Sequence, residues 1–313
     1  MTTLCPYDNS TRVVRFGHQS GRQMYFCRDC KRKFRGFETV DEQSLFKMKY
    51  PLRTITEVLT LYFNGMSFRN LSASYDDLAH KSIPKMTLWR WVIDFSEHVN
   101  RYVNTLRPQL GQVWYADETV VKIFGENWWF WDIIDQKTRF LVASHLSKGR
   151  DIYKATQLFR QAISVSERMP RIIITDKLNA YKPAIGNAFS KVYGTVPIHL
   201  TSHGFDSPTN INLIERFHGT VRQRTKVLKG FKHPYSASII LDGFTVHYNF
   251  FMEHSHLNGI TPASAAGIGK NIHDWGDLIR LASQTRLPFK ASRAVRRVRK
   301  NPINVLPPEW RGK

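Results

Sequence analysis

Three acidic residues stand where a metal-dependent active site could form. Asp117 lies within the alternating segment GQVWYADETVVKI, Asp176 ends the apolar run RIIITD, and Glu215 opens the basic segment ERFHGTVRQRTK. If the first and fourth strands of a sheet are neighbours, the two aspartates lie side by side, and a helix packed over that edge offers the glutamate. Converging carboxylates suit Mg²⁺, and a pair of such ions serves phosphodiester chemistry.

Basic residues follow Glu215 at spacings that suit a DNA backbone. His218 and Arg222 come three and seven residues after Glu215, on the same helical face, and Arg224 lies close by. We expect these three residues to bind DNA phosphates beside the scissile bond. The alternative for Glu215 alone is an acid near a helix N-terminus, favoured by the helix dipole and by basic partners one turn later.

Other acids nearby are less suited to bind a metal. Glu118 follows Asp117 directly but points to the opposite face of the strand. Asp132 and Asp135 lie at or beyond strand ends, and Asp151 is interpreted as a helix cap or a surface partner of Arg150. None of these acids is expected to be a ligand.

Residues 109 to about 235 have the pattern of an α/β domain. Three strands in meander order are predicted first, followed by an amphipathic helix at 151–165. The run RIIITD is typical of a strand buried on both faces. A helix at 177–189, a short strand at 196–200 and a long helix from 212 complete the predicted order βββαβαβα. The aromatic cluster at 128–131 is interpreted as core rather than as a base-stacking surface.

Residues 1–36 have the spacing of a zinc ribbon with one changed position. The first half of the motif is CPYD, so Asp8 stands where the second cysteine belongs, and the second half is CRDC. Zinc accepts carboxylate and imidazole ligands, so Asp8 or His18 could complete a site with the three thiols Cys5, Cys27 and Cys30. The alternative is a decayed ribbon that folds without metal.

Residues 37–108 are predicted to form short helices. A turn at Gly65 and a capping Ser67 separate two of them, and a third follows Pro84. This pattern suggests a helix-turn-helix whose last helix lies in the DNA major groove. Its outward DNA contacts would be Lys85, Thr87 and Arg90. An ordinary helical packing domain is the alternative.

The charge balance favours a polyanionic partner. The 313 residues include 46 Lys and Arg against 25 Asp and Glu, a net charge of +21. A basic tail is predicted at 271–313, where Arg296 and Arg297 would contact phosphates, although such runs are commonly only solvated. Apolar runs stay well below the ~18 residues of a spanning helix, and no signal peptide is recognised at the start, so a cytoplasmic protein without a membrane partner is expected.

Four segments resemble the successive catalytic blocks of bacterial and archaeal insertion-sequence transposases of the DDE type, which have a retroviral-integrase-like core. They are WYADETVVKI, WWFWDIIDQKTRFLVASHLSKGRD, ITDKLNAYKPAI and NLIERFHGTVRQRTKVLKGFK. The resemblance covers residues 111 to about 262 and implies that Asp117, Asp176 and Glu215 are the metal-binding triad, with Arg222 as the basic residue after the glutamate. Glu215 follows Asp176 by 39 residues, a longer interval than in many relatives.

The resemblance also implies the fold and the reaction. The fold class is α/β, a ribonuclease H-like core at 109–270 with a mixed five-stranded sheet and flanking helices, preceded by the ribbon and the helix-turn-helix. The implied cofactor is Mg²⁺ or Mn²⁺. The implied partners are double-stranded DNA, as terminal inverted repeats and as target, and at least one further copy of the chain; cleavage would be followed by strand transfer at the nucleoid. Two alternatives are a DNA-binding regulator with an inert core and a stand-alone ribonuclease H-like nuclease.

Overall fold

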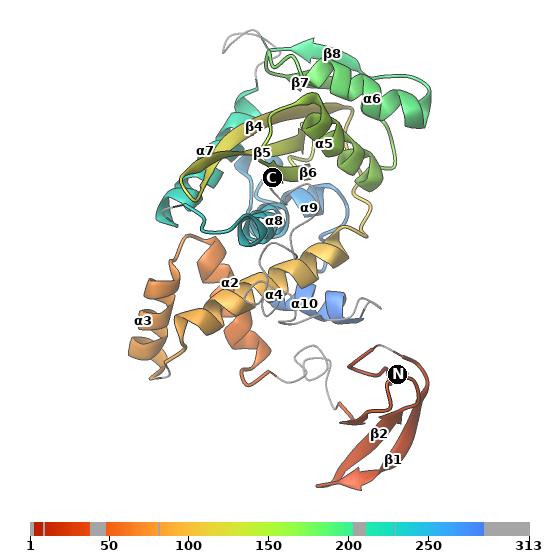
Figure 1. The fold of residues 1–313 in the computed structure, drawn as a ribbon, viewed down its shortest axis with the longest axis vertical. Helices are drawn as coiled ribbons and strands as arrows, with labels where there is room; N and C mark the ends of the chain where they lie inside the picture. Colours follow the sequence, from red (N-terminus) through yellow and green to blue (C-terminus); the bar gives the residue numbers. More distant parts are fainter. Residues whose placement is uncertain are drawn as a thin grey trace.

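The structure contains a small N-terminal sheet, a group of helices and a layered α/β unit (Figure 1). It is a computed structural model that describes residues 3–8, 10–37, 48–80, 82–202, 211–228 and 230–284. Arg296 and Arg297, expected to contact DNA, lie outside these ranges. Within the same ranges, no helix is both long and apolar enough to cross a membrane.

The α/β unit is built on one mixed sheet of five strands in the order β6-β5-β4-β7-β8. The strands are β4 (Val113–Ile123), β5 (Glu126–Asp135), β6 (Leu141–Ser147), β7 (Ile172–Thr175) and β8 (Ile198–Thr201). β4, β5 and β6 pair antiparallel, whereas β7 runs parallel to both β4 and β8. The first and fourth strands are therefore neighbours, which is the condition for bringing the two aspartates together, and the sheet fits the ribonuclease H-like fold that the resemblance implies.

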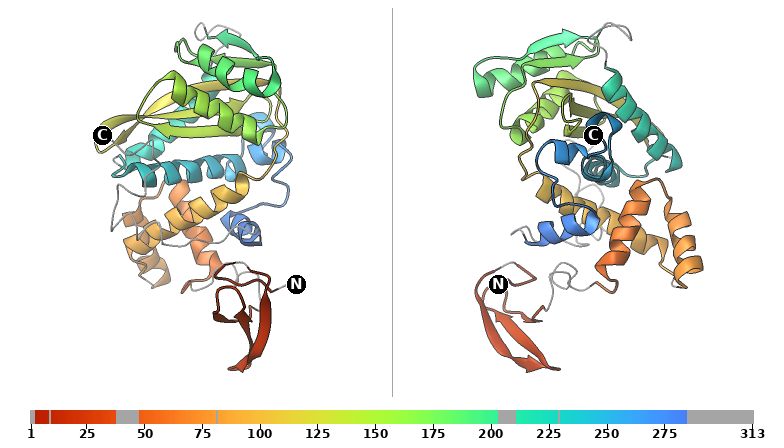
Figure 2. Two further views of the ribbon diagram at one scale, coloured as in Figure 1. Left: turned by 45° about the vertical axis from the view of Figure 1, so that its right-hand side comes forward. Right: turned by 180° about the vertical axis from the view of Figure 1, so that it is seen from behind.

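Two pairs of helices cover the two faces of the sheet (Figures 1 and 2). One face packs against α5 (Ile152–Val165) and α6 (Tyr181–Tyr193), and the other against α7 (Asn212–Val227) and α8 (Pro234–Phe251). The sequence order βββαβαβα is as predicted. The predicted cap is also confirmed, because the Asp151 carboxylate accepts a hydrogen bond of 3.0 Å from the Lys154 amide.

The aromatic cluster of β5 lies mostly in the core, as interpreted from the sequence. Side chains alternate between the two faces of a strand. Trp131 therefore packs with α5 and α6, while Trp128 and Phe130 pack on the opposite face. Trp129 is half-buried, and the guanidinium of Arg150 lies 4.5 Å from its ring centroid.

The helical group begins with α2 (Leu52–Phe63), α3 (Phe68–Ala79) and α4 (Lys85–Val103). The turn before α3 contains Gly65 at a φ of +117°, a conformation that glycine adopts without steric cost. Ser67 caps α3, because its hydroxyl accepts a 3.1 Å hydrogen bond from the Asn70 amide. Both local predictions for this region are confirmed, and the helix-turn-helix function stays a prediction.

Helix α8 joins the helical group to the sheet in one continuous hydrophobic core (Figure 1). On the sheet side, the buried Asn249 amide pairs with Leu141, accepting from its N–H at 2.8 Å and donating to its carbonyl at 3.1 Å. On the other side, Gly243 allows α8 to approach Phe63 and Ser96 closely. The short helices η1 (Ser255–Leu257) and α9 (Pro262–Ala265) then lead to α10 (Trp275–Gln284).

Helix α10 corrects the boundary expected for the basic tail. Its Trp275 is fully buried and stacks on Phe63 with ring centroids 5.0 Å apart. A tail beginning at 271 is therefore wrong for residues 275–284, because the apolar face of α10 packs on α2 and α4.

The N-terminal sheet has three antiparallel strands, β1 (Val13–Gln19), β2 (Arg22–Cys27) and β3 (Lys33–Arg35). Its core is small and consists of Cys5, Cys27 and Phe34 with a few half-buried neighbours. So small a core supplies little hydrophobic stabilisation, so a further cross-link such as a metal would strengthen it.

The space around Gly243 and Gly186 differs, so replacing each glycine by alanine should change the unfolding free energy in opposite directions. In Gly243→Ala the new methyl would lie 2.5 Å from Phe63 and from the Ser96 hydroxyl, so we expect a loss of about 1–3 kcal/mol in unfolding free energy. Gly186, within α6, has open space around its Cβ position, so Gly186→Ala should stabilise by about 0.5–1 kcal/mol. Chemical denaturation would measure both, and equal effects would contradict the packing described here.

A buried histidine at the same junction predicts an acid-dependent loss of stability. His247 is 3% exposed with Nε2 3.3 Å from Asn64 Oδ1, and burial, aided by the charge of Arg224, lowers its pKa to about 4. Below pH 6.5 the histidine is protonated in the unfolded chain, whereas His247 stays neutral in the folded protein until the pH approaches 4. Stability should therefore fall as the pH drops from 6.5 towards 4, by up to about 1.4 kcal/mol per pH unit for this group.

His247→Gln tests this assignment. The variant should lose less stability than the wild type between pH 7 and pH 5, measured by denaturation at each pH. His98, whose pKa burial also lowers to about 4, contributes equally to both proteins. An identical loss in both proteins would show that His247 does not resist protonation.

Candidate active site

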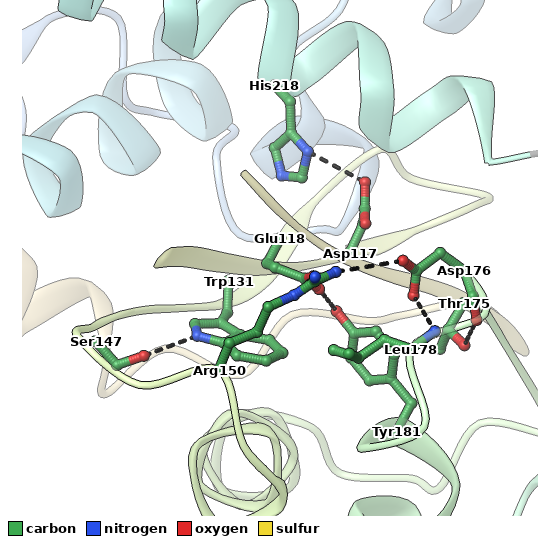
Figure 3. Close-up of polar contacts among 10 residues, drawn as sticks. All are labelled: Asp117, Glu118, Trp131, Ser147, Arg150, Thr175, Asp176, Leu178, Tyr181 and His218. Atoms are coloured by element: carbon green, nitrogen blue, oxygen red, sulfur yellow. Dashed lines mark hydrogen bonds and ion pairs between the residues drawn. The ribbon is translucent and has the colours of Figure 1, made fainter. Parts of the chain in front are cut away.

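Two of the expected metal ligands meet where β4 and β7 lie side by side. β4 and β7 pair in parallel with Ala116 opposite Thr175, so Asp117 and Asp176 each follow one residue later along the chain. Asp176 is held by a hydrogen bond of 2.9 Å from the Leu178 amide to its Oδ1 (Figure 3). The side chain of Asp117 is 13% exposed and that of Asp176 is 31% exposed, so both remain accessible. The prediction that these aspartates are neighbours agrees with the structure.

A third acid, Glu118, completes a cluster that the sequence interpretation did not foresee. One carboxylate oxygen from each of Asp117, Glu118 and Asp176 lies within 4.8 Å of the others. Glu118 does face the opposite side of β4, where its side chain is 1% exposed. Its Oε2 accepts a 2.5 Å hydrogen bond from the Tyr181 hydroxyl, and its Oε1 forms an ion pair with Arg150. Both Glu118 oxygens therefore have protein partners, and its exclusion as a ligand stays a prediction.

Arg150 links Glu118 to the metal-binding candidates. Its guanidinium lies 3.7 Å from Asp176 Oδ2, beside the Glu118 ion pair (Figure 3). Burial raises the pKa of Glu118, an effect that Tyr181 and Arg150 oppose. Burial also raises the pKa of Asp176, and the neighbouring charge of Asp117 adds to this effect. Added positive charge would stabilise both carboxylates in their ionised form.

His218 binds Asp117 from helix α7, on the other side of the cluster. Its Nδ1 lies 3.3 Å from Asp117 Oδ2, and its Nε2 lies 3.1 Å from Asp132 Oδ2. Burial alone would lower the pKa of His218, but the hydrogen bonds to the two carboxylates raise it to about 9. His218 was expected to bind DNA phosphates, and this expectation is wrong: the side chain is 2% exposed and both nitrogens face carboxylates.

Glu215 lies in the first turn of α7, one turn before His218, and is exposed. Residues three apart on a helix lie on the same side of it, so Glu215 projects from the side of α7 that carries His218. Among the described residues, the clustered carboxylates are those of Asp117, Glu118 and Asp176, without Glu215. Its role as the third ligand stays a prediction.

The other expected DNA contacts fall into three groups. Lys85 is exposed, and Thr87 and Arg90 are half-buried, all in the first two turns of α4. Arg222 is exposed on α7. Arg224 is 6% exposed, so its expected DNA contact is wrong.

Arg224 faces the helical group instead of solvent. Its guanidinium lies 4.2 Å from the Tyr62 ring centroid and donates to the Met66 carbonyl at 3.3 Å. The physical reason is helical geometry, because Arg222 and Arg224 are two residues apart and project from nearly opposite sides of α7. Arg224 therefore joins α7 to the α2–α3 turn.

A second group of possible ligands lies in the N-terminal sheet. The ligand atoms of Cys5, Asp8, Cys27 and Cys30 all lie within 4.8 Å of one another. The sulfurs of Cys5 and Cys30 are 3.6 Å apart, and both Asp8 oxygens are 3.6 Å from the Cys27 sulfur. Tetrahedral zinc with Zn–S bonds of about 2.3 Å separates its sulfurs by about 3.8 Å, so this donor set fits zinc. His18, the other candidate, is exposed on β1 and lies outside this group.

The sequence interpretation missed Asp132, although a signal for it was present. Asp132 was placed at a strand end, but it is fully buried in β5 directly opposite Asp117. The β4–β5 hairpin turns at Phe124 and Gly125, both with positive φ. A two-residue turn fixes the register of a hairpin, and counting back from it pairs Asp117 with Asp132.

Comparison with known proteins identifies the central part of the chain. Residues 111–254 match a family model described as a DDE domain. No curated protein matches the chain.

Several solved structures are similar to parts of the chain. The HTLV-2 integrase catalytic core domain in complex with magnesium is 21% identical, covering 51% of this chain and 99% of that chain, with a TM-score of 0.38. A simian T-cell lymphotropic virus intasome in complex with PP2A regulatory subunit B56 gamma is 18% identical, covering 53% and 58%, with a TM-score of 0.39. The catalytic core domain of BIV integrase is 14% identical, covering 50% and 93%, with a TM-score of 0.36.

The family match spans the strands and helices that carry Asp117, Asp176 and Glu215. Residues 111–254 of this chain therefore form a DDE domain.

Proposed function

We propose that this chain is a DNA transposase that cleaves phosphodiester bonds at the ends of a mobile element and joins those ends to target DNA. The convergence of Asp117 and Asp176 at the β4–β7 pair carries this proposal. Both side chains remain partly exposed, so a DNA strand can reach them. The match to a DDE domain and the net charge of +21 support the same reaction class and the same partner.

Asp117 and Asp176 would hold a divalent metal, Mg²⁺ or Mn²⁺, with Glu215 as the third ligand from α7. Their hard oxygen atoms fit such ions. The bound metal would supply Lewis-acid activation of the attacking oxygen and stabilisation of the leaving oxygen. Arg222, exposed on α7, would bind backbone phosphates beside the reacting one.

The proposed reaction consists of two displacements at phosphorus. In the first, a water oxygen bonds to phosphorus as the bond to the 3′ oxygen breaks, and the 3′ oxygen leaves as a hydroxyl at the element's end. In the second, that hydroxyl attacks a target phosphodiester and releases a new 3′-hydroxyl. Two ends must be held together for joining, so we propose that the active form contains at least two copies of the chain.

The N-terminal parts would recognise the DNA. We assign residues 1–36 as a zinc ribbon and 37–108 as a helix-turn-helix, in which the exposed start of α4 enters the major groove. Lys85, Thr87 and Arg90 lie on this segment, and the catalytic domain follows at 109–270 with a basic tail after α10.

Replacing Asp117 tests the catalytic assignment. In Asp117→Asn the amide removes a charged ligand at constant shape, so nicking and joining of labelled DNA from the gene's flanks in Mg²⁺ should fall at least about 10²-fold, while DNA binding by gel shift is retained. The matched control is Asp151→Asn, which removes an exposed acid and keeps a good helix cap. Cleavage retained by Asp117→Asn would refute the site, and wild-type binding without any product in Mg²⁺ or Mn²⁺ would favour a non-catalytic regulator.

Single substitutions in the ribbon test the proposed zinc site. Purified wild type should contain about one zinc ion per chain by elemental analysis, and Cys27→Ser should lose it because serine is a poor zinc ligand. Asp8→Ala should retain much less zinc after dialysis against a chelator, whereas His18→Ala should behave like the wild type. The reverse pattern would make His18 the fourth ligand, and zinc-free wild type would mean that the ribbon folds without metal.

A further inference from the structure

A buried chain of polar contacts connects the candidate site to two strands and one helix. Asp117 on β4 contacts His218 on α7 at 3.3 Å, and His218 contacts Asp132 on β5 at 3.1 Å. Figure 3 shows the imidazole reaching from the helix towards Asp117. Of the three side chains, Asp117 alone has appreciable exposure, at 13%, whereas His218 is 2% exposed and Asp132 is fully buried.

Apolar side chains surround Asp117, His218 and Asp132, and burial among them disfavours charged groups. The Phe217 ring lies 5.8 Å from the His218 ring and packs in the core with Phe244 and Tyr248. A buried carboxylate without a polar partner is strongly destabilising. Asp132 contributes nothing to solvent-exposed chemistry, because it is fully buried, so its interaction with His218 accounts for an acid at this position.

The strand register explains why an imidazole is required between the two acids. Asp117 and Asp132 are direct partners across β4 and β5, so their side chains share one face of the sheet. Like charges directly opposite each other destabilise a strand pair. The His218 ring carries nitrogen atoms on two edges of one rigid plane, so it contacts both carboxylates at once, at 3.3 Å and 3.1 Å.

We propose that His218, held in place by Asp132, is a positioning residue that orients Asp117 for metal binding and fastens helix α7 to β4. Asp132 fixes the imidazole through Nε2, which leaves Nδ1 directed at a single oxygen of Asp117. The contact between His218 and Asp117 also fixes α7 at a point one turn after Glu215. It therefore limits how the Glu215 side chain can approach the aspartates. This inference rests on the proposed function, since it treats Asp117 as a metal ligand.

Metal affinity distinguishes positioning from general stability. Groups that orient a metal ligand typically change affinity by about 10–100-fold when they are replaced. In His218→Gln and in Asp132→Asn, the concentration of Mn²⁺ that half-saturates cleavage of labelled flank DNA should rise by about 10-fold or more, with much of the cleavage recovered at saturating Mn²⁺. A purely structural role would lower the thermal unfolding temperature and leave the half-saturating concentration unchanged.

The matched control is His247→Gln. His247 is also buried and also lies on a helix of the same layer, but its side chain hydrogen-bonds to Asn64 rather than to an acid of the site. Its replacement should change stability without moving the Mn²⁺ half-saturation. Asp132→Asn keeps the shape of the wild-type side chain, so it provides the test if His218→Gln does not fold.

Direct titration with Mn²⁺ alone tests the positioning role of His218 and Asp132 separately from the role of Asp117 as a metal ligand. If wild type binds Mn²⁺, Asp117→Asn does not, and both network variants bind like the wild type, the positioning role is overturned while the proposed function stands. If wild type and Asp117→Asn bind Mn²⁺ alike, Asp117 is not a ligand and the proposed function itself fails. Weakened binding in His218→Gln and Asp132→Asn, with normal binding in His247→Gln, is the result that we expect.

Discussion

The parallel pairing of β4 with β7 is the interaction on which the candidate site depends. Neither strand holds two of the expected ligands, so only their register brings Asp117 beside Asp176. Shifting β4 by one residue would turn Asp117 to the face covered by α5 and α6 and would bring Glu118 to the other face. The buried, apolar length of β7 enforces the register, because its residues pack against both helical layers of the domain.

Local patterns were sufficient to predict the strands, their order and the two aspartates. Alternation in β4 and the continuous apolar run of β7 each identify a strand from its own residues, and the change to polar residues after Thr175 marks where β7 ends. The contacts between side chains within the site could not be predicted from such local patterns. Tyr181 reaches Glu118 across 63 residues of sequence, and His218 reaches Asp132 across 86, so no local pattern joins them.

Local patterns also could not predict which basic residues of α7 are exposed. Arg222 and Arg224 look alike in the sequence, and both suit DNA, yet one is exposed and the other lies beneath Tyr62. Tyr62 belongs to α2, which lies far from α7 in the sequence, so no local pattern predicts this contact. The helix that carries Glu215 and His218 is therefore fixed at one end to the sheet, through His218, and at the other to the α2–α3 turn, through Arg224.

Local pairing, rather than the large net positive charge, stabilises the acids of the site. A distant lysine or arginine is screened by water and salt, whereas the cost of burying a carboxylate is local. Glu118 and Asp132 are the two most buried acids of the site, and each has its own cation, Arg150 or His218. Asp117 lies 3.3 Å from His218 and Asp176 lies 3.7 Å from Arg150, and Asp176 also accepts a hydrogen bond from the Leu178 amide. Asp117 and Asp176 are the acids of the site that remain partly exposed, and for this reason we propose that a further cation binds to this pair.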